Sequence, residues 1–120
     1  MDNLTEKIIA AAIEVHRYLG PGLLESIYEE ALCHELSLRG IAVERQVERD
    51  VIYKGVAIKG QRIDLLVQGE VVVELKSLAS TPDIAKAQTL SYLKSTGLTR
   101  ALLINFGCPR LVDGLTRISL

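Results

Sequence analysis

The stretch from Arg62 to Lys76 has the pattern of a β-hairpin that is apolar except for a few charged side chains. Its two arms, residues 63–67 and 71–75, are rich in Val, Leu and Ile, which favour strands. Within or at the end of these arms lie three charged residues, Asp64, Glu74 and Lys76. Burying a charge is costly unless it has a partner. The chain must therefore fold so that these groups have partners or access to water.

The register of this hairpin follows from the need to keep one face apolar, because side chains alternate between the two faces of a strand. A two-residue turn is the commoner solution, but it would bring Glu74 onto the apolar face. A three-residue loop at Gln68–Glu70, or a bulge, instead pairs Ile63 with Leu75 and closes an apolar face. We therefore predict the longer loop or a bulge, which sets Asp64 opposite Glu74.

Asp64 and Glu74 would then face each other across the hairpin, with their Cβ atoms roughly 5 Å apart. Two carboxylates at this spacing repel each other unless a cation lies between them, and hard oxygen ligands suit Mg²⁺ or Mn²⁺. Lys76 points to the same side, where it can hold a water molecule, stabilise developing negative charge or form an ion pair. The alternative is a solvated hairpin face, but the apolar residues Leu66 and Val72 on the same side argue against it.

The whole chain has the pattern of an α/β domain without repeats. Helices are expected at residues 4–19, 24–39 and 82–95, and strands at residues 43–53, 56–67, 71–76, 101–105 and 116–120. The last helix should begin with Thr81 as its N-cap and stop at Gly97. The tight turn between the first two strands should lie at Lys54 and Gly55.

The helical periodicity also predicts which side chains are buried. In the first helix the buried stripe would consist of Ile9, Ala12, Ile13 and His16, with His16 as a packed core histidine. In the second helix the inward residues would be Leu24, Ile27, Tyr28, Ala31, Leu32 and Leu38. Glu29 and Glu30 are expected to be solvated. Tyr28 has two open roles, either in the core or with its hydroxyl in the cleft of the charged residues.

Composition favours one small domain over residues 1–120. With 48% apolar and 24% charged residues, the chain can bury one core and has no room for a second domain. No apolar run is long enough to span a bilayer and the N-terminus lacks the order of a signal peptide, so we expect a cytoplasmic protein without membrane contact. The two cysteines, Cys33 and Cys108, are too few for a structural zinc site and are expected to be reduced thiols.

The charge balance limits how such a chain can bind nucleic acid. Its net charge is only −1, whereas phosphate contacts need clustered Lys and Arg. A short or single-stranded substrate, or a protein partner that supplies binding, fits this balance better than a long duplex. An exposed final strand is also compatible with a homodimer.

Several motifs resemble those of the PD-(D/E)XK nuclease superfamily. Asp64 followed by Glu74-Leu75-Lys76 is similar to the pattern that names the superfamily, and Gly22 to Tyr28 reads as the signature of its small GxxExxY family. Further matching pieces are residues 15–22, 74–77, Gln88 with Tyr92, 93–94 and 103–107. The proline that precedes the aspartate in the superfamily pattern is replaced by Ile63, at a position that supplies no ligand.

The resemblance implies a restriction-endonuclease-like α/β fold, with a mixed central β-sheet flanked by helices and an extra N-terminal helix. It further implies a catalytic set made of Glu25, Asp64, Glu74, Lys76, Gln88 and Tyr92. The metal ion, Mg²⁺ or Mn²⁺, would be held by Asp64, Glu74, the Leu75 carbonyl and Glu25. In this set Lys76 would orient or activate the attacking water, and Gln88 would orient the lysine, a water molecule or a phosphate.

Three of these residues also have structural interpretations. Glu25 is expected at the start of a helix, where a carboxylate gains from the helix dipole. Gln88 and Tyr92 are four residues apart on one helical face, where they can act as an edge amide and a packing tyrosine. The sequence leaves both interpretations open.

The function implied by the resemblance is metal-dependent hydrolysis of nucleic acid, with DNA preferred to RNA as the substrate. The alternative is a catalytically silent nuclease fold that binds nucleic acid or another protein. The presence of all the ligand types favours the enzyme, because a degenerate site would be expected to lose Lys76 or a carboxylate first. A transferase or phosphatase is disfavoured, because the chain has no nucleophile motif.

Overall fold

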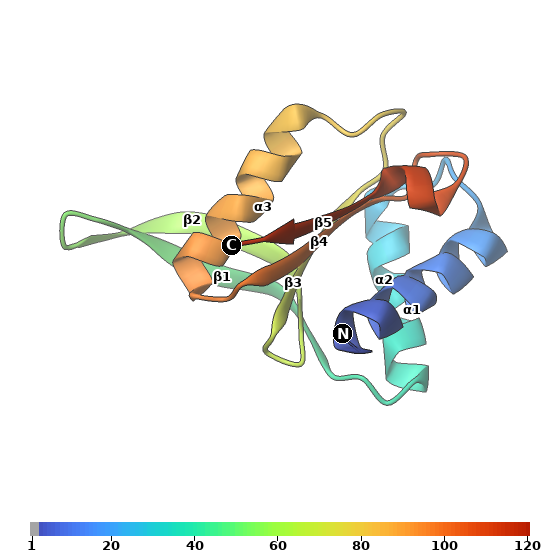
Figure 1. Ribbon diagram of the computed structural model, residues 1–120, viewed down its shortest axis with the longest axis horizontal. Helices are drawn as coiled ribbons and strands as arrows, with labels where there is room; N and C mark the ends of the chain where they lie inside the picture. Colours follow the sequence, from blue (N-terminus) through green and yellow to red (C-terminus); the bar gives the residue numbers. More distant parts are fainter. Residues whose placement is uncertain (1–2) are drawn as a thin grey trace.

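A computed structural model describes residues 3–120, which fold around a five-stranded sheet (Figure 1). The elements are, in chain order, α1 (Asn3–Leu19), α2 (Glu25–Leu38), β1 (Val43–Tyr53), β2 (Val56–Val67), β3 (Val71–Lys76), α3 (Asp83–Thr96), β4 (Arg100–Asn105), the 3₁₀ helix η1 (Leu111–Gly114) and β5 (Leu115–Ser119). The strand order is β1-β2-β3-β4-β5, in which only β3 and β4 are parallel. The predicted mixed sheet flanked by helices is confirmed.

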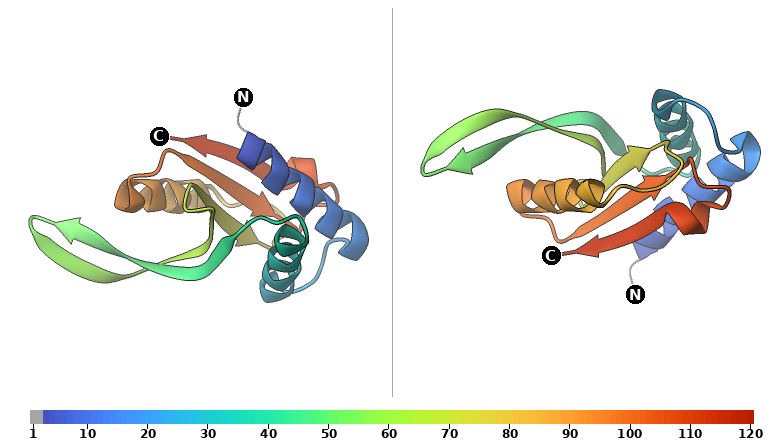
Figure 2. Two further views of the ribbon diagram at one scale, coloured as in Figure 1. Left: turned by 90° about the horizontal axis from the view of Figure 1, so that it is seen from below. Right: turned by 90° about the horizontal axis from the view of Figure 1, so that it is seen from above.

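The helices cover the two faces of the sheet. α3 is the crossover that a parallel pair such as β3 and β4 requires, and it packs on one face, while α1 and α2 pack on the other (Figures 1 and 2). The smaller core, under α3, consists of Ile63, Leu66, Val72, Tyr92, Leu93 and Ala101. The larger core lies under α1 and α2. β3 is therefore buried on both faces, and Val71 to Leu75 are all buried.

The element boundaries agree closely with the prediction. β1, β2 and β3 have the predicted bounds, while β4 begins one residue earlier and β5 is shifted by one residue. The three α-helices agree within one residue at each end, but η1 was not predicted. Lys54 and Gly55 form the turn between β1 and β2 with φ angles of 48° and 84°, as two-residue hairpin turns require.

The hairpin of β2 and β3 has the predicted three-residue loop. Val67 pairs with Val71, so residues 68–70 form the loop. Gln68 and Gly69 adopt φ angles of 54° and 67°, in the left-handed region. The need for an apolar face therefore overrides the commoner two-residue turn, as the pattern of apolar residues predicts.

The predicted pairing of Ile63 with Leu75 is wrong. The ladder between β2 and β3 ends at Leu65 and Val73. Beyond this point β2 stays paired with β1, and the two strands leave the sheet as a projecting arm (Figure 2). Ile63 packs in the core under α3, whereas Leu75 belongs to the core under α1 and α2. The prediction assumed that side chains alternate between the two faces of a regular hairpin. This alternation is lost where β2 departs from β3.

Part of the predicted helix burial is also wrong. The exposed residues are Leu24, which is the N-cap of α2, Ile27 and Leu38 on α2, and Ile13 on α1. α2 buries Tyr28, Leu32 and Leu36, which are spaced by four residues, and Leu36 was not predicted. This narrow stripe indicates that α2 contacts the rest of the molecule along one line, so residues to either side of it reach water. His16 is buried as predicted, and its Nε2 lies 2.9 Å from the carbonyl oxygen of Cys108.

Glu29, which the sequence analysis placed in solvent, is buried and fully engaged. Its carboxylate accepts hydrogen bonds from Arg45 at 2.9 and 3.1 Å and from Gln46 at 2.7 Å. Arg45 also pairs with Glu30 at 2.9 Å. A carboxylate with this many donors can be buried without a large penalty. These hydrogen bonds and ion pairs join α2 to β1, so Arg45 has a structural role.

Asn105, the last residue of β4, organises the loop that follows β3. Its Oδ1 accepts hydrogen bonds from the N–H groups of Leu78 and Gly107, each at 3.0 Å. Its Nδ2 donates to Oγ1 of Thr81 at 3.1 Å. The prediction of Thr81 as N-cap is therefore wrong, because the N-cap of α3 is Pro82 and the Thr81 hydroxyl is used by Asn105.

The same loop leaves no space for a side chain at Gly107. A Cβ atom there would lie 2.1 Å from the carbonyl oxygen of Leu78, a backbone atom that no side-chain rotation can move. We expect Gly107→Ala to lower the free energy of unfolding by about 1–3 kcal/mol, measured by urea denaturation. The control is Ser80→Ala, an exposed residue of the same loop, which should change it by less than about 0.5 kcal/mol. Equal midpoints for the two variants would contradict this packing.

Candidate active site

Asp64 lies where β2 leaves β3, and its side chain ends the ladder between them. Oδ2 of Asp64 accepts a hydrogen bond from the N–H of Leu75 at 2.9 Å. In a continued antiparallel ladder that N–H would donate to the backbone of Ile63. The carboxylate therefore takes the place of a strand carbonyl, and this bond holds the half-buried Asp64 side chain against β3.

The carbonyl of Leu75 points toward the same side as Asp64. In an antiparallel strand, the N–H and C=O of one residue point to the same neighbouring strand. Since the Leu75 N–H donates to Asp64, its C=O faces that side as well. The next carbonyl, that of Lys76, points the other way and accepts the N–H of Phe106 at 2.8 Å. The backbone thus adds one oxygen to the side of the carboxylates.

Glu74 is the most deeply buried charged residue of this site, with 4% of its surface exposed. Its Oε2 lies 3.6 Å from Nζ of Lys76. Its Oε1 is buried and has no hydrogen-bond partner among residues 3–120. The pKa of Glu74 is raised to about 8, mainly by burial and also by the charge of Asp64, while Lys76 acts in the opposite direction. Glu74 therefore lies between the negative charge of Asp64 and the ammonium group of Lys76 in a poorly solvated place.

Glu25, the first residue of α2, faces the same charges from another element. Burial raises the pKa of Glu25, and the negative charge of Asp64 adds to the shift, while Lys76 lowers it. The residue is exposed enough to contact water. The fold therefore brings Glu25 within electrostatic range of Asp64 and Lys76, although the sequence separates them by about 40 residues or more.

Tyr92 of α3 lies on the same face of the sheet as Glu74, in the core that contains Val72. It is 4% exposed, and its pKa is raised to about 12, mainly by burial and also by the charges of Glu74 and Asp64. Gln88, one turn earlier, is exposed and lines with Tyr92 a groove of about 350 Å³ between α3 and the arm. The fold thus brings Glu25, Lys76 and Tyr92 within electrostatic range of Asp64 or Glu74, and it places Gln88 in the adjoining groove.

Comparison with known proteins agrees with this geometry. A family model of the PD-(D/E)XK nuclease superfamily matches residues 2–118. The chain belongs to this superfamily. No curated protein matches the sequence. Within residues 3–120, no helix of this nuclease-superfamily chain is long and apolar enough to cross a membrane.

Nucleases of this superfamily generally depend on a divalent metal, and the residues present fit one. The unpartnered Oε1 of Glu74 is a buried acceptor without a donor among residues 3–120. Burial and the charge of Asp64 raise the pKa of this carboxyl, so a bound cation would favour its ionised form. Carboxylate and carbonyl oxygens are the ligands that Mg²⁺ and Mn²⁺ prefer. Within residues 3–120, no three His, Cys, Asp or Glu side chains form one metal-binding cluster, so direct ligation by Glu25 stays a prediction.

Residues outside the predicted set hold the nuclease motif in place. The hydroxyl of Tyr28 donates to the carbonyl of Gly20 and accepts the N–H of Leu23, and its ring stacks on Phe106 at 4.5 Å. The Ser77 hydroxyl donates to the carbonyl of Leu23. Tyr28 is therefore a core residue whose hydroxyl fixes the loop before α2, which removes the alternative of a hydroxyl in the cleft. Sequence reasoning missed Ser77, although its place directly after β3 was a usable signal.

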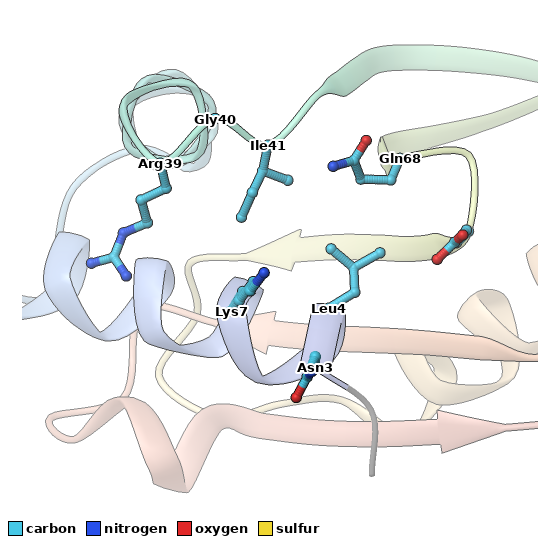
Figure 3. A pocket seen from close by; sticks show the side chains of 8 residues that line it. Asn3, Leu4, Lys7, Arg39, Gly40, Ile41 and Gln68 are labelled. Carbon is cyan, nitrogen blue, oxygen red and sulfur yellow. The ribbon is translucent and has the colours of Figure 1, made fainter.

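A separate cavity of about 380 Å³ lies away from the carboxylates. It is formed by the start of α1, the end of α2 and the turn between β2 and β3 (Figure 3). Lys7 and Arg39 reach it, but none of the predicted site residues lines it. Arg39 is already paired with Glu35 at 2.8 Å. The candidate catalytic residues of this superfamily member therefore lie around Glu74 and not in this cavity.

The raised pKa of Glu74 predicts how stability depends on pH in protein kept metal-free with EDTA. A carboxyl whose pKa rises on folding, here from 4.5 to about 8, destabilises the fold once it ionises. The free energy of unfolding should fall between about pH 5 and pH 9. Since one pKa unit corresponds to about 1.4 kcal/mol, the fall should reach a few kcal/mol.

Glu74→Gln, which cannot ionise, should flatten this pH profile, as measured by urea denaturation at several pH values. The control is Glu6→Gln on α1, an exposed residue far from the cluster. A profile of Glu74→Gln as steep as that of the wild type would contradict the assignment. Adding Mn²⁺ to the wild type should restore stability at high pH, because a cation bound to the ionised carboxylates favours the folded state.

Proposed function

We propose that this chain is a metal-dependent nuclease of the GxxExxY family that hydrolyses phosphodiester bonds, in DNA in preference to RNA. The observation that carries the proposal is Oε1 of Glu74, which is buried and has no partner among residues 3–120, while Lys76 lies 3.6 Å from the other oxygen, Oε2. A site built only for stability would be expected to satisfy such an atom, because an unpaired buried acceptor costs about 1–3 kcal/mol. The unpaired Oε1 of Glu74 can be retained despite its cost in stability if this atom binds a ligand during catalysis.

In this proposal Asp64, Glu74 and the Leu75 carbonyl hold the ion, either Mg²⁺ or Mn²⁺. When bound, a divalent ion stabilises negative charge on a phosphate and lowers the pKa of a water ligand. The protein supplies the position of these oxygens. The bond from Leu75 N–H leaves Oδ1 of Asp64 for ligation, and burial of Glu74 keeps its carboxylate away from bulk water. The backbone of β3 pairs with β4 along its full length and the Leu75 N–H is held by Asp64, so these oxygens need no large rearrangement of β3.

Lys76 has the second role in the mechanism. Its ammonium lies next to Glu74, on the side where the attacked phosphate would sit. An ammonium there can orient the attacking water and balance the charge that develops on the phosphate oxygens. It lies in the last position of β3 and is half-buried, so its freedom to move is small.

Three residues from helices complete the proposed site. Glu25 at the start of α2 would hold a second ion or a water molecule, for which its electrostatic link to Asp64 is the support. Tyr92 would limit water access to Glu74 and stay protonated, since its pKa is raised to about 12. Gln88, exposed in the groove beside Tyr92, would contact a phosphate or orient Lys76.

The proposal also keeps two expectations from the sequence, a cytoplasmic location and assembly with a second copy or a protein partner. β5 lies at an edge of the sheet, where a further strand can add. Size-exclusion chromatography with light scattering measures the oligomeric state directly.

The test is cleavage of labelled single- and double-stranded DNA and RNA with Mg²⁺, Mn²⁺ or EDTA. We expect metal-dependent cleavage by the wild type and a loss of at least about 100-fold in Asp64→Asn and Lys76→Ala, because each removes a charge at the reacting centre. Asp64→Asn keeps an acceptor for the Leu75 N–H, so its fold should be preserved. Mn²⁺ binding, measured by calorimetry, should survive in Lys76→Ala.

Matched controls are Asp113→Asn in η1 and Lys7→Ala in α1, which change the same charges at exposed positions outside the cluster. Both should cleave as the wild type does. If the wild type cleaves none of the four substrates under any metal condition, the enzyme proposal fails and the silent nuclease fold that binds nucleic acid takes its place. Cleavage that persists in Lys76→Ala would reject the role given to Lys76.

A further inference from the structure

The arm formed by β1 and β2 extends beyond the sheet and has a strongly exposed end. Every residue from Val51 to Gly60 is exposed, and the two strands project away from the helices and the rest of the sheet (Figures 1 and 2). The exposed residues include large apolar side chains, among them Ile52 at 67% and Tyr53 at 59%. An exposed apolar arm of this kind commonly marks a surface that binds a partner molecule.

A groove of about 350 Å³ separates this arm from α3. Val51, Ile58, Lys59, Gly60, Gln61 and Arg62 line it from the arm, and Gln88 and Tyr92 line it from α3. Tyr92 also belongs, with Val72 of β3, to the core under α3. Val72 and Glu74 share one face of β3, so the groove adjoins the face of the sheet that carries Glu74.

The polar groups of the groove favour an anionic ligand. The lining of the groove includes two cations, Lys59 and Arg62, and no acidic residue. Arg62 pairs with Glu48 at 3.3 Å, but both side chains are exposed, so this ion pair is weak. Lys59 is exposed and makes no ion pair with any residue in 3–120. It is therefore available to contact a phosphate.

Amide groups add neutral hydrogen-bonding capacity to the same walls. Gln61 donates from Nε2 to Oγ of Ser91 on α3 at 2.8 Å. Its Oε1 is buried and has no hydrogen-bond partner among residues 3–120. This second unpartnered acceptor lies next to the groove, as Oε1 of Glu74 lies in the site. A donor from a base or from an ordered water molecule would satisfy it.

The backbone of the arm is shaped around the groove. The pairing of β1 and β2 shifts register between Arg49 and Val51, which is a bulge that bends the arm. Gly60 has a φ of 127°, and no atom lies within 4 Å of the position that a Cβ would take. A glycine in a strand often marks a place where a ligand approaches the backbone closely. The open space at Gly60 is consistent with such an approach.

We propose that this groove binds one strand of nucleic acid next to the scissile phosphate, with Lys59 contacting a phosphate and Val51 and Ile58 packing against bases. This inference rests on the proposed nuclease function and names its substrate as single-stranded. A volume of about 350 Å³ is at the small end for a ligand pocket, which suits one chain rather than a duplex. Single-strand sites combine cations with side chains on which bases pack, and Lys59 with Val51 and Ile58 provides such a combination, whereas a duplex needs many phosphate contacts.

The test is fluorescence anisotropy with a labelled oligonucleotide of about 12 nucleotides, within the usual span of single-strand sites. Binding is measured in EDTA with protein that carries Lys76→Ala, so that cleavage cannot interfere. We expect Lys59→Ala to raise Kd for the single strand roughly fivefold and to reduce the slope of log K against log salt by about 0.7. Lys59→Arg should restore most of the affinity, since it keeps the charge.

The matched control is Lys7→Ala, an exposed lysine on α1 that lines the separate cavity in Figure 3. It should leave both Kd and the salt slope unchanged. If Lys59→Ala behaves as Lys7→Ala does, or if the duplex of the same sequence binds more tightly than the single strand, the inference is overturned. These measurements involve no cleavage, so they test the groove separately from the nuclease activity. If the single strand binds through Lys59 but the wild type cleaves nothing, the proposed function is rejected and the binding role of the groove is retained.

Discussion

The hydrogen bond from the Leu75 N–H to Oδ2 of Asp64 is the interaction on which the rest of the site depends. It occupies the last ladder position of β3 with a carboxylate, so β2 is released from β3 after Leu65. That release directs β2 into the arm, turns Ile63 toward α3 and leaves Glu74 opposite a charged side chain. The side chain of Asp64 thus replaces a backbone carbonyl as the acceptor of the Leu75 N–H, and both the groove and the acidic site follow from this replacement.

The structure tolerates an unfavourable arrangement at Glu74 because its surroundings are rigid. β3 is buried on both faces, paired with β4 along its full length and continued by a loop that Asn105 holds through two hydrogen bonds. On the other side, Tyr28 fixes the loop that leads to Glu25. These contacts place two carboxylates and one ammonium close together at a cost in stability. Such a cost is common where a site is organised in advance for a charged ligand.

Much of the fold was readable from local patterns. Alternation and turn residues determine β1, β2 and the loop at residues 68–70, because a register slip would move charge into the core. The helix faces were less predictable. Ile13 and Ile27 have the right spacing for burial, yet they are exposed, since the width of a buried stripe depends on how many neighbours surround the helix. The burial of Glu29 likewise depended on Arg45 and Gln46, which come from a distant strand.

The sequence by itself determined the pair of carboxylates and the lysine at the end of β3, because strand periodicity and the D…ExK spacing place them within one hairpin. It also indicated the mixed sheet and the order of its elements. Only the tertiary structure decided that the ladder stops at Leu65, that Glu25 and Tyr92 approach this pair from two helices, and that Gln88 faces a groove under the arm. Contacts between segments distant in sequence arise from packing, and local sequence patterns do not specify that packing.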